Sequence, residues 1–348
     1  MTAGRKASVY IFKFPGGKDV KHDGGNKYHY CDKENDGERV DITLETDPVK
    51  FPGYNKLVHK PFTSGVKIQS IKYYEEASGD FNYSLDKCTS VSVYYWERDD
   101  GYEKLLLLEV ETTDNGKKYY VMGKTTEWKD TNIQHDDLFT LLERENCTMN
   151  KAHHINISKK DGQPYDCHSC DHQIRASSFN FKGEYRKVTH EPNDGYVGRI
   201  TDGEGNINEI DLPADVTTVE VYWYPNLSEG PILIEVKGVL EKGDTSIRLS
   251  EWYRLSTNGK TWRTTDPPRG RLEGSDPVLA LLHQIDRELN PHFYLSSTGK
   301  YYKPNVSHVI ISTGVVVGTL IVVCYLLFSG WKLNKMSMSY LINQSLSL

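Results

Sequence analysis

The sequence predicts an α+β fold: two tandem β-rich modules of mostly antiparallel sheet with one helix each, plus one C-terminal transmembrane helix. Three observations carry this prediction: a long internal repeat, period-2 patterns of β-branched and aromatic residues, and one uninterrupted apolar segment. The 348 residues suffice for two domains and an anchor. We place the first module at 1–152, the second at 153–298, a juxtamembrane linker at 299–308, the transmembrane helix at 309–328 and a short tail at 329–348.

The internal repeat consists of five matches in the same order. The motif Y-x-K-x-x-H-x-P at 54–61 returns at 185–192. The remaining matches pair SVSVYYW (90–96) with TVEVYWY (218–224), LLLEV (106–110) with LIEV (233–236), Tyr119-Tyr120 and Trp128 with Trp252-Tyr253 and Trp262, and LFTLLEREN (138–146) with VLALLHQIDREL (278–289). Because the offset drifts by only a few residues, we interpret the repeat as a duplication with small loop insertions.

The strands of each module follow from alternation and turn signals. In 90–96, alternate β-branched and aromatic residues predict a strand, and the DDG turn that follows leads into a second strand at 105–112. Asp114-Asn115-Gly116 is a hairpin signal into 118–122, and Gly243-Asp244 stands at the equivalent turn of the second copy. Three similar strands are predicted at 8–13 (SVYIFK), 154–158 (HINIS) and 292–296 (HFYLS).

One helix is predicted near the end of each module. Apolar residues at i, i+3 and i+4 indicate a helix from Leu138 and another from Val278. Acidic residues at 136–137 precede the first helix, and Asp276-Pro277 precedes the second, which are residue types favoured at helix N-termini.

The apolar segment at 309–328 contains no charge and is long enough to span a bilayer of about 30 Å. Gly314 and Gly318 would let two such helices approach closely, which predicts a weak homodimer. Lysines flank both ends, so the side of the membrane is left open. The N-terminal region offers only a four-residue apolar run at 9–12, too short for a signal peptide. Either an export signal lies upstream, or the chain is tail-anchored with its modules in the cytosol.

The motifs VSVYYW with LLLLEV, the KYYV…W hairpin and the LLERENC…INISKK segment resemble the FAINT-type domain, a repeat expanded in Theileria-like piroplasm parasites. The resemblance covers most of residues 8–298. It implies secreted or membrane-displayed parasite proteins that face the host, and it brings no catalytic residues with it.

Six cysteines are few for this length. Cys324 lies in the apolar segment, and the other five, an odd number, allow at most two disulfides and leave a thiol over. Cys167 and Cys170 have the C-x-x-C spacing of half a zinc site, with His172 and His153-His154 nearby. Since no second C-x-x-C exists, we expect a local disulfide or exposed thiols here, and no metal.

The remaining candidates are weighed against structural roles. His59 and His190 recur with the module. We expect each ring to pack in the core and to satisfy a backbone carbonyl, rather than to act as a pH-sensitive ligand group. Adjacent carboxylates cannot share a proton on a strand, so Glu75-Glu76, Asp99-Asp100 and Asp136-Asp137 are interpreted as solvated turn and cap residues. Gly203-Glu204-Gly205 lacks a following helix and cradles no phosphate. Glycosylation acceptor sequences occur at Asn82, Asn226 and Asn305.

The sequence therefore predicts a membrane-anchored, non-enzymatic repeat protein without catalytic residues, cofactor or metal. We interpret it as a binding or antigen protein displayed at a cell surface and facing the host. The alternative is a tail-anchored interaction scaffold facing the cytosol. The expected partners are the lipid bilayer and a host or self protein, bound through the repeated aromatics Tyr94, Tyr95, Trp96, Trp128, Tyr222, Trp223, Tyr224 and Trp262. A net charge of −6 without a basic stripe argues against nucleic acid.

Overall fold

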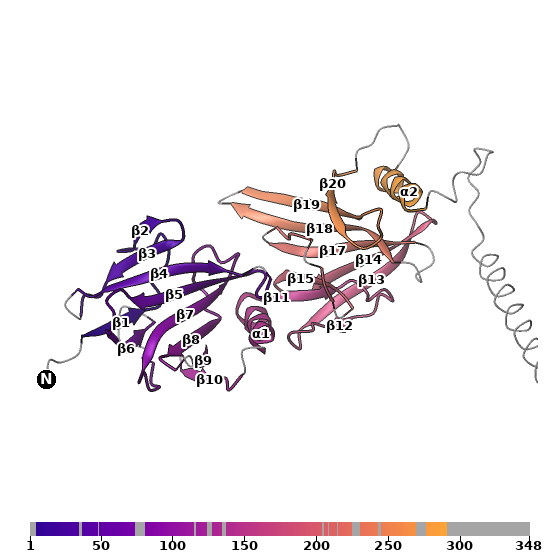
Figure 1. Ribbon diagram of the computed structural model, residues 1–348. Helices are drawn as coiled ribbons and strands as arrows, with labels where there is room; N and C mark the ends of the chain where they lie inside the picture. The colour runs from indigo at the N-terminus through magenta and orange to yellow at the C-terminus, as the bar shows by residue number, and fades with distance from the viewer. Residues whose placement is uncertain are drawn as a thin grey trace, which may run out of the picture. The chain divides into compact units, whose positions relative to one another are not determined.

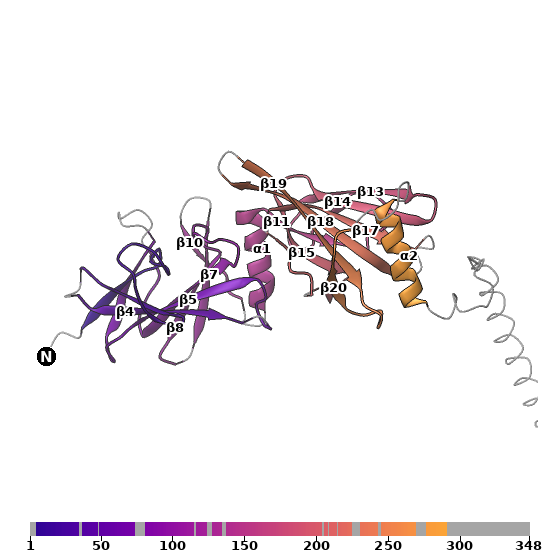
Figure 2. The same ribbon diagram turned by 90° about the horizontal axis from the view of Figure 1, so that it is seen from above.

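The structure is a computed structural model, and its helices and strands are labelled in Figure 1 and seen from above in Figure 2. The chain divides into two compact units, Met1–Leu282 and His283–Leu348. The structure describes residues 5–290 except 35–36, 48, 74–80, 115, 124–126, 134–136, 204, 208, 214, 225–229, 243–244 and 269–275.

The first half of the chain builds one antiparallel sheet with the strand order β10-β9-β8-β7-β5-β4-β3-β2. A separate parallel pair joins β1 to β6, and α1 follows β10. The elements are β1 (Lys6–Tyr10), β2 (Lys21–Gly24), β3 (Lys27–Cys31), β4 (Arg39–Thr46), β5 (Tyr54–Pro61), β6 (Lys67–Lys72), β7 (Cys88–Trp96), β8 (Leu107–Thr112), β9 (Lys117–Met122), β10 (Trp128–Asp130) and α1 (Leu138–Asn150).

The second half builds an antiparallel sheet with the order β12-β13-β14-β17-β18-β19-β20. Here β11 pairs in parallel with β15, which also pairs with β16. The elements are β11 (Ala152–Asn156), β12 (Tyr165–Asp166), β13 (Gln173–Phe181), β14 (Tyr185–Pro192), β15 (Tyr196–Asp202), β16 (Gly205–Asn206), β17 (Val216–Trp223), β18 (Pro231–Lys242), β19 (Thr245–Leu255), β20 (Trp262–Thr265) and α2 (Pro277–Leu289).

The two halves have equivalent strand orders. Replacing β3, β4, β5, β7, β8, β9 and β10 by β12, β13, β14, β17, β18, β19 and β20 converts the order of the first sheet, apart from its edge strand β2, into that of the second. The parallel pairs also match: each has one register shift, between Ala7 and Ser8 in β1 and between His153 and His154 in β11. This correspondence places His153 at the position of Ala7, and it makes each half an internal reference for the other.

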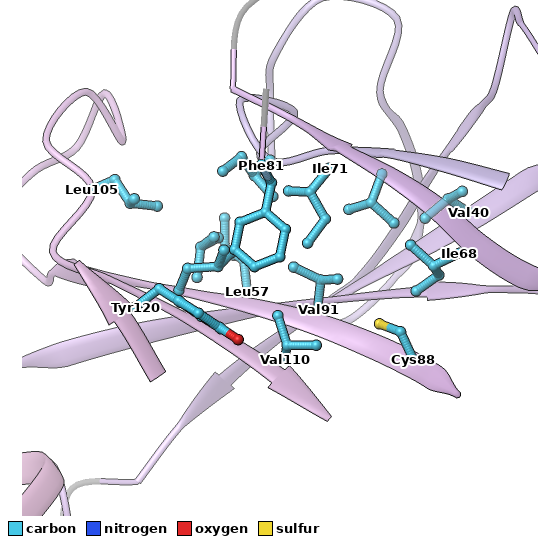
Figure 3. Packing of buried hydrophobic residues seen from close by; sticks show 14 of the residues in the cluster. Val40, Leu57, Ile68, Ile71, Phe81, Cys88, Val91, Leu105, Val110 and Tyr120 are labelled. Carbon is cyan, nitrogen blue, oxygen red and sulfur yellow. The ribbon is translucent and has the colours of Figure 1, made fainter. Parts of the chain in front are cut away.

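The sheet of the first half has two apolar faces because successive side chains of a strand point to opposite sides. On one face, Ile68 and Ile71 of β6 pack toward Val91 and Val110 of the sheet, as Figure 3 shows. On the other face, three leucines of α1 pack in a cluster with Tyr54 and Tyr94: Leu138, Leu141 and Leu142. Full burial of each such side chain contributes about 1.5–3 kcal/mol.

The helices begin where the apolar spacing predicts, but their N-termini differ. The Asp276 carboxylate accepts hydrogen bonds from the backbone N–H groups of Val278 and Leu279, at 3.0 and 3.3 Å, and caps α2. Asp137 precedes α1 without a capping hydrogen bond from its side chain. The expected N-cap chemistry therefore exists at α2 only.

The predicted α+β class is wrong. The described residues form a mostly β protein, because α1 and α2, of 13 residues each, stand beside twenty strands. The prediction overlooked β2–β4 and β12–β13, which add strands to both sheets. Neither described helix has the length and apolar character needed to cross a membrane. The predicted segment 309–328, the strand 292–296 and the glycine pair Gly314 and Gly318 lie outside the described residues.

Gly198 lets β15 approach β11 closely. A Cβ atom at this position would lie 2.8 Å from three atoms of Ala152, two of them in the backbone. We expect Gly198→Ala to lower the free energy of unfolding by about 1–3 kcal/mol, because the tightly packed pair must separate. Gly230→Ala, which meets nothing within 4 Å, is the matched control and should change stability by under about 0.5 kcal/mol. Urea titrations followed by circular dichroism measure both, and equal effects would contradict the close approach.

Candidate functional site

The repeated aromatic residues are mostly interior. Six of the eight are buried: Tyr94, Tyr95, Trp128, Tyr222, Trp223 and Trp262. Trp96 and Tyr224 are half-buried. The six buried side chains pack inside the two halves. They therefore do not form the outward aromatic surface through which we expected a partner to bind.

His59 and His190 are both fully buried, at equivalent positions of β5 and β14. Within the described residues, neither ring nitrogen of His59 has a hydrogen-bond partner. His190 differs, since its Nδ1 lies 3.1 Å from the Tyr165 hydroxyl. Burial lowers the pKa of His59 to about 3 and that of His190 to about 4, so both rings are neutral near pH 7. The structure gives them a core role without the carbonyl partner that we expected.

A Lys–Tyr–Glu cluster recurs on one side of each sheet. In the first half, the Glu109 carboxylate accepts hydrogen bonds from Lys56 Nζ at 3.0 Å and from the Tyr94 hydroxyl at 2.8 Å, and Lys117 Nζ lies 3.2 Å away. Burial opposes ionisation of Glu109, but the lysines outweigh it and hold the pKa of its carboxyl below the usual value. The cluster is internally neutralised.

The second half rebuilds this cluster with an extra carboxylate. Glu220 pairs with Lys187 and, at 2.8 Å, with Lys237, whose Nζ also lies 3.2 Å from Glu235. Glu220 stands where the first half has Ser92, as the paired motifs at 90–96 and 218–224 show. Because every charge in these clusters has an opposite partner, we interpret them as structural.

A cavity of about 240 Å³ adjoins the first cluster. It is lined by Glu45, Asp47, Lys50, Phe51, Tyr54, Lys56, Tyr94 and Lys117. Both signs of charge line it, and Lys56 and Lys117 already bind Glu109. A cavity of this size is below the range of typical small-molecule sites, about 300–1,000 Å³, so it does not by itself indicate a cofactor.

A buried polar network centres on Glu143 of α1. Its carboxylate lies 2.6 Å from His154 Nε2 and 2.9 Å from Arg199 Nη2, and it accepts a hydrogen bond from the Tyr54 hydroxyl at 2.9 Å. Burial raises the pKa of the Glu143 carboxyl, but the hydrogen bond from His154 and the charge of Arg199 lower it by more, so the pKa lies below its usual value and the carboxyl stays ionised.

Ser169 turns this network into an arrangement that resembles a Ser–His–Glu triad. However, the Ser169 hydroxyl lies 3.2 Å from Nδ1 and 3.4 Å from Nε2 of His154. The oxygen is therefore beside the ring rather than in line with one nitrogen, and Nε2 is already bound to Glu143. A general base needs a directed hydrogen bond to its nucleophile, so this geometry does not support hydrolysis.

The C-x-x-C cysteines meet His153, which the sequence argument placed near them, and Cys147, which it did not combine with them. Cys147 forms a disulfide with Cys170, while Cys167 is a buried free thiol. His153 lies beside them, with its Nδ1 at 3.1 Å from the Cys147 sulfur. The sequence signal that we overlooked is the short spacing from Cys147 to His153, which a helix end followed by a strand brings together.

The other candidate residues take the structural roles expected for them. The Asp99 carboxylate accepts hydrogen bonds from the backbone N–H groups of Glu103 and Lys104 and so closes a turn. Gly203 and Gly205 flank the β15–β16 turn. Asn82 is exposed. The remaining positions lie outside the described residues: Glu75, Glu76, Asp136, Glu204, Asn226, Asn305 and Cys324.

The β18–β19 hairpin of the second half is longer than its counterpart. β17 pairs with β18 only as far as Gly238, and β20 pairs with β19 only over Trp252–Leu255. Residues 245–251 of β19, which we call the open edge, have no further strand paired with them in the described part of the chain. Figure 1 shows β18 and β19 extending past β17.

Comparison with known proteins gives no relative: no family model, no curated protein and no solved structure matches this chain.

Proposed function

We propose that the chain is a non-enzymatic protein-binding protein whose second module accepts an extended segment of a partner as an additional strand on the open edge. The observation that carries this proposal is the length of β18 and β19 beyond their neighbours. A strand without a neighbour presents unpaired backbone N–H and C=O groups, and adding a strand satisfies them.

The side chains at the open edge support recognition of a defined kind of segment. Ile247 is 48% exposed. Val239 on the neighbouring strand is 38% exposed, but it pairs with Arg248 and so lies on the other face of the sheet. Arg248 stands between Ile247 and Leu249 in the sequence, so it projects from the opposite face of the strand. A partner that alternates apolar and acidic residues would place the apolar ones beside Ile247 and the acidic ones beside Arg248.

The first half supports the proposal as an internal comparison. Its equivalent hairpin ends at β8 (Leu107–Thr112) and β9 (Lys117–Met122), and β7 pairs with β8 as far as Thr112. The extension is thus an addition to the second copy of a duplicated fold rather than a requirement of the fold. Surface segments that vary between copies of a fold and do not contribute to its core often carry binding functions.

A displayed peptide library tests this function. We expect selection on the immobilised full chain to enrich peptides that alternate apolar and acidic residues. Ile247→Lys should reduce their binding at least about tenfold, because it puts a charge beside the apolar residues of the peptide. Phe62→Lys is the control, since Phe62 is 64% exposed and lies in the first half. Binding that survives Ile247→Lys, or falls equally in both variants, would refute a site at the open edge.

Display at a membrane stays a prediction, as does the alternative of a cytosolic scaffold. The open edge would serve either role, because strand addition depends on the partner's backbone and not on the compartment.

A further inference from the structure

Four metal-ligating side chains from three separate elements converge in the second half. Cys147 lies near the end of α1, His153 on β11, and Cys167 and Cys170 in the loop between β12 and β13. One ligand atom from each lies within 4.8 Å of all the others, and three of the four residues are buried. Buried thiols and an imidazole gathered in this way have the composition of a Cys₃His metal centre.

Two of the distances within the cluster are those of a tetrahedron around zinc, the Cys147–His153 distance is shorter, and the bonded sulfurs of Cys147 and Cys170 must separate on reduction. Zn–S bonds of about 2.3 Å and Zn–N bonds of about 2.0–2.1 Å place two sulfurs about 3.8 Å apart, and a sulfur and a nitrogen about 3.6 Å apart. The sulfurs of Cys147 and Cys167 are 3.7 Å apart. His153 Nδ1 lies 3.1 Å from the Cys147 sulfur and 3.5 Å from the Cys170 sulfur.

We propose that Cys147, His153, Cys167 and Cys170 bind one zinc ion when the thiols are reduced. The Cys147–Cys170 disulfide is the oxidised form of the same site. Two equivalents of a thiol such as glutathione open it: they supply two electrons and two protons, give two cysteine thiols, and leave as their own disulfide. Zinc then displaces the thiol protons and binds three sulfurs and one nitrogen. This differs from the sequence-based expectation that the site holds no metal.

The surroundings orient the ligands. His153 is 3% exposed, and its Nε2, which has no hydrogen-bond partner among the described residues, faces the Asp194 carboxylate at 3.6 Å. A zinc-bound histidine characteristically directs its other ring nitrogen at a carboxylate. The backbone N–H of His154 points at the Cys167 sulfur at 3.2 Å, where it would stabilise a thiolate. His172 is not a second nitrogen ligand, since its ring stacks on that of His153 at 4.1 Å and pairs with Asp194.

The first half shows what the duplicated fold does without these ligands. At the end of β3, where the second half has Cys167 at the end of β12, the first half has the fully buried Asp32. Its carboxylate accepts hydrogen bonds from the backbone N–H of Ser8 at 2.7 Å and the Tyr10 hydroxyl at 3.1 Å. Ser8 is the equivalent of His154, so the same backbone donor meets an aspartate in one copy and a cysteine in the other. Only the second copy is built for a metal.

Titration of cobalt into the full chain tests the proposal, after reduction with a phosphine and without oxygen. We expect one equivalent of Co²⁺ to bind with the absorption bands of tetrahedral, thiolate-bound cobalt, and zinc to displace it. Cys167→Ser separates the metal from the disulfide, because Cys167 is outside the disulfide. It should weaken cobalt binding at least about a hundredfold. Cys167→His, which supplies a nitrogen ligand in place of the sulfur, should recover binding with a weaker sulfur-to-cobalt band.

Two further variants complete the design. Cys31→Ser removes a cysteine remote from the cluster and should leave binding unchanged. Asp194→Asn should weaken binding by about 10–100-fold while the tetrahedral spectrum persists. The proposal is overturned if the reduced wild-type chain binds no cobalt, or if Cys167→Ser binds it with the wild-type affinity and spectrum. Recovery by Cys167→His shows that a loss in Cys167→Ser comes from the ligand and not from misfolding.

Discussion

Replacing Glu143 by alanine is expected to destabilise the protein by about 3–5 kcal/mol. Glu143 is 5% exposed, and its carboxylate balances Arg199 and the ring of His154. Removing one partner of a buried ion pair leaves the other charge without compensation in a region of low dielectric, which costs more than the pair itself contributes. The free energy of unfolding from urea titrations at neutral pH measures this effect.

Glu145→Ala is the matched control because it removes the same side chain two residues away. Glu145 is 15% exposed and pairs at 3.0 Å with Arg144, whose side chain is 57% exposed, so solvent screens the pair. Pairs of this kind contribute at most about 1 kcal/mol. Similar losses in the two variants would show that the Glu143 network does not stabilise the fold.

Acid is expected to destabilise the protein through His59 and His190. Both have folded-state pKa values below the usual 6.5, about 3 and about 4, because burial penalises the charged ring. The unfolded chain therefore takes up more protons than the folded one below about pH 6.5. The free energy of unfolding is therefore unaffected by these rings above pH 6.5. It falls by about 1.4 kcal/mol per pH unit for each histidine as the pH drops from 6.5 toward 4.

Leucine at both positions should flatten this dependence, because an apolar side chain takes up no proton in either state. Urea midpoints measured between pH 4 and 7 compare the double variant His59→Leu/His190→Leu with the wild type. His168→Leu, at an exposed histidine, should retain the wild-type slope. An unchanged slope in the double variant would assign the acid sensitivity to other groups.

Strong local patterns predicted many elements of this fold. The apolar spacing located the starts of α1 and α2, alternation located β7, and the turn signals that follow it located β8 and β9. The class was wrong because several strands were overlooked, and some of these carry weak signals. β2 (Lys21–Gly24) is exposed at every residue, so its sequence lacks the apolar alternation that marks a half-buried strand. β12 has only two residues.

The candidate metal centre could be predicted from the sequence only in part. The C-x-x-C spacing was visible, but the other ligands depend on how α1 is joined to β11. Lys151, between them, adopts the left-handed conformation with φ 53°, which ends the helix and returns the chain beside it. A lysine gives no sign of this conformation in the sequence, since glycine is the usual residue there. Cys147 and His153 could not be brought together without it.

The parallel pairs have a consequence for the order of folding. Most strands of both sheets join neighbours along the chain, but β1 must wait for β6, since Lys6 pairs with Lys67. Closing so long a loop costs entropy before any contact rewards it, so such pairings form late. During synthesis the opening strand of each copy would leave the ribosome first and dock after the hairpins. The residues that are synthesised first in each copy are thus the last to find their partner strand.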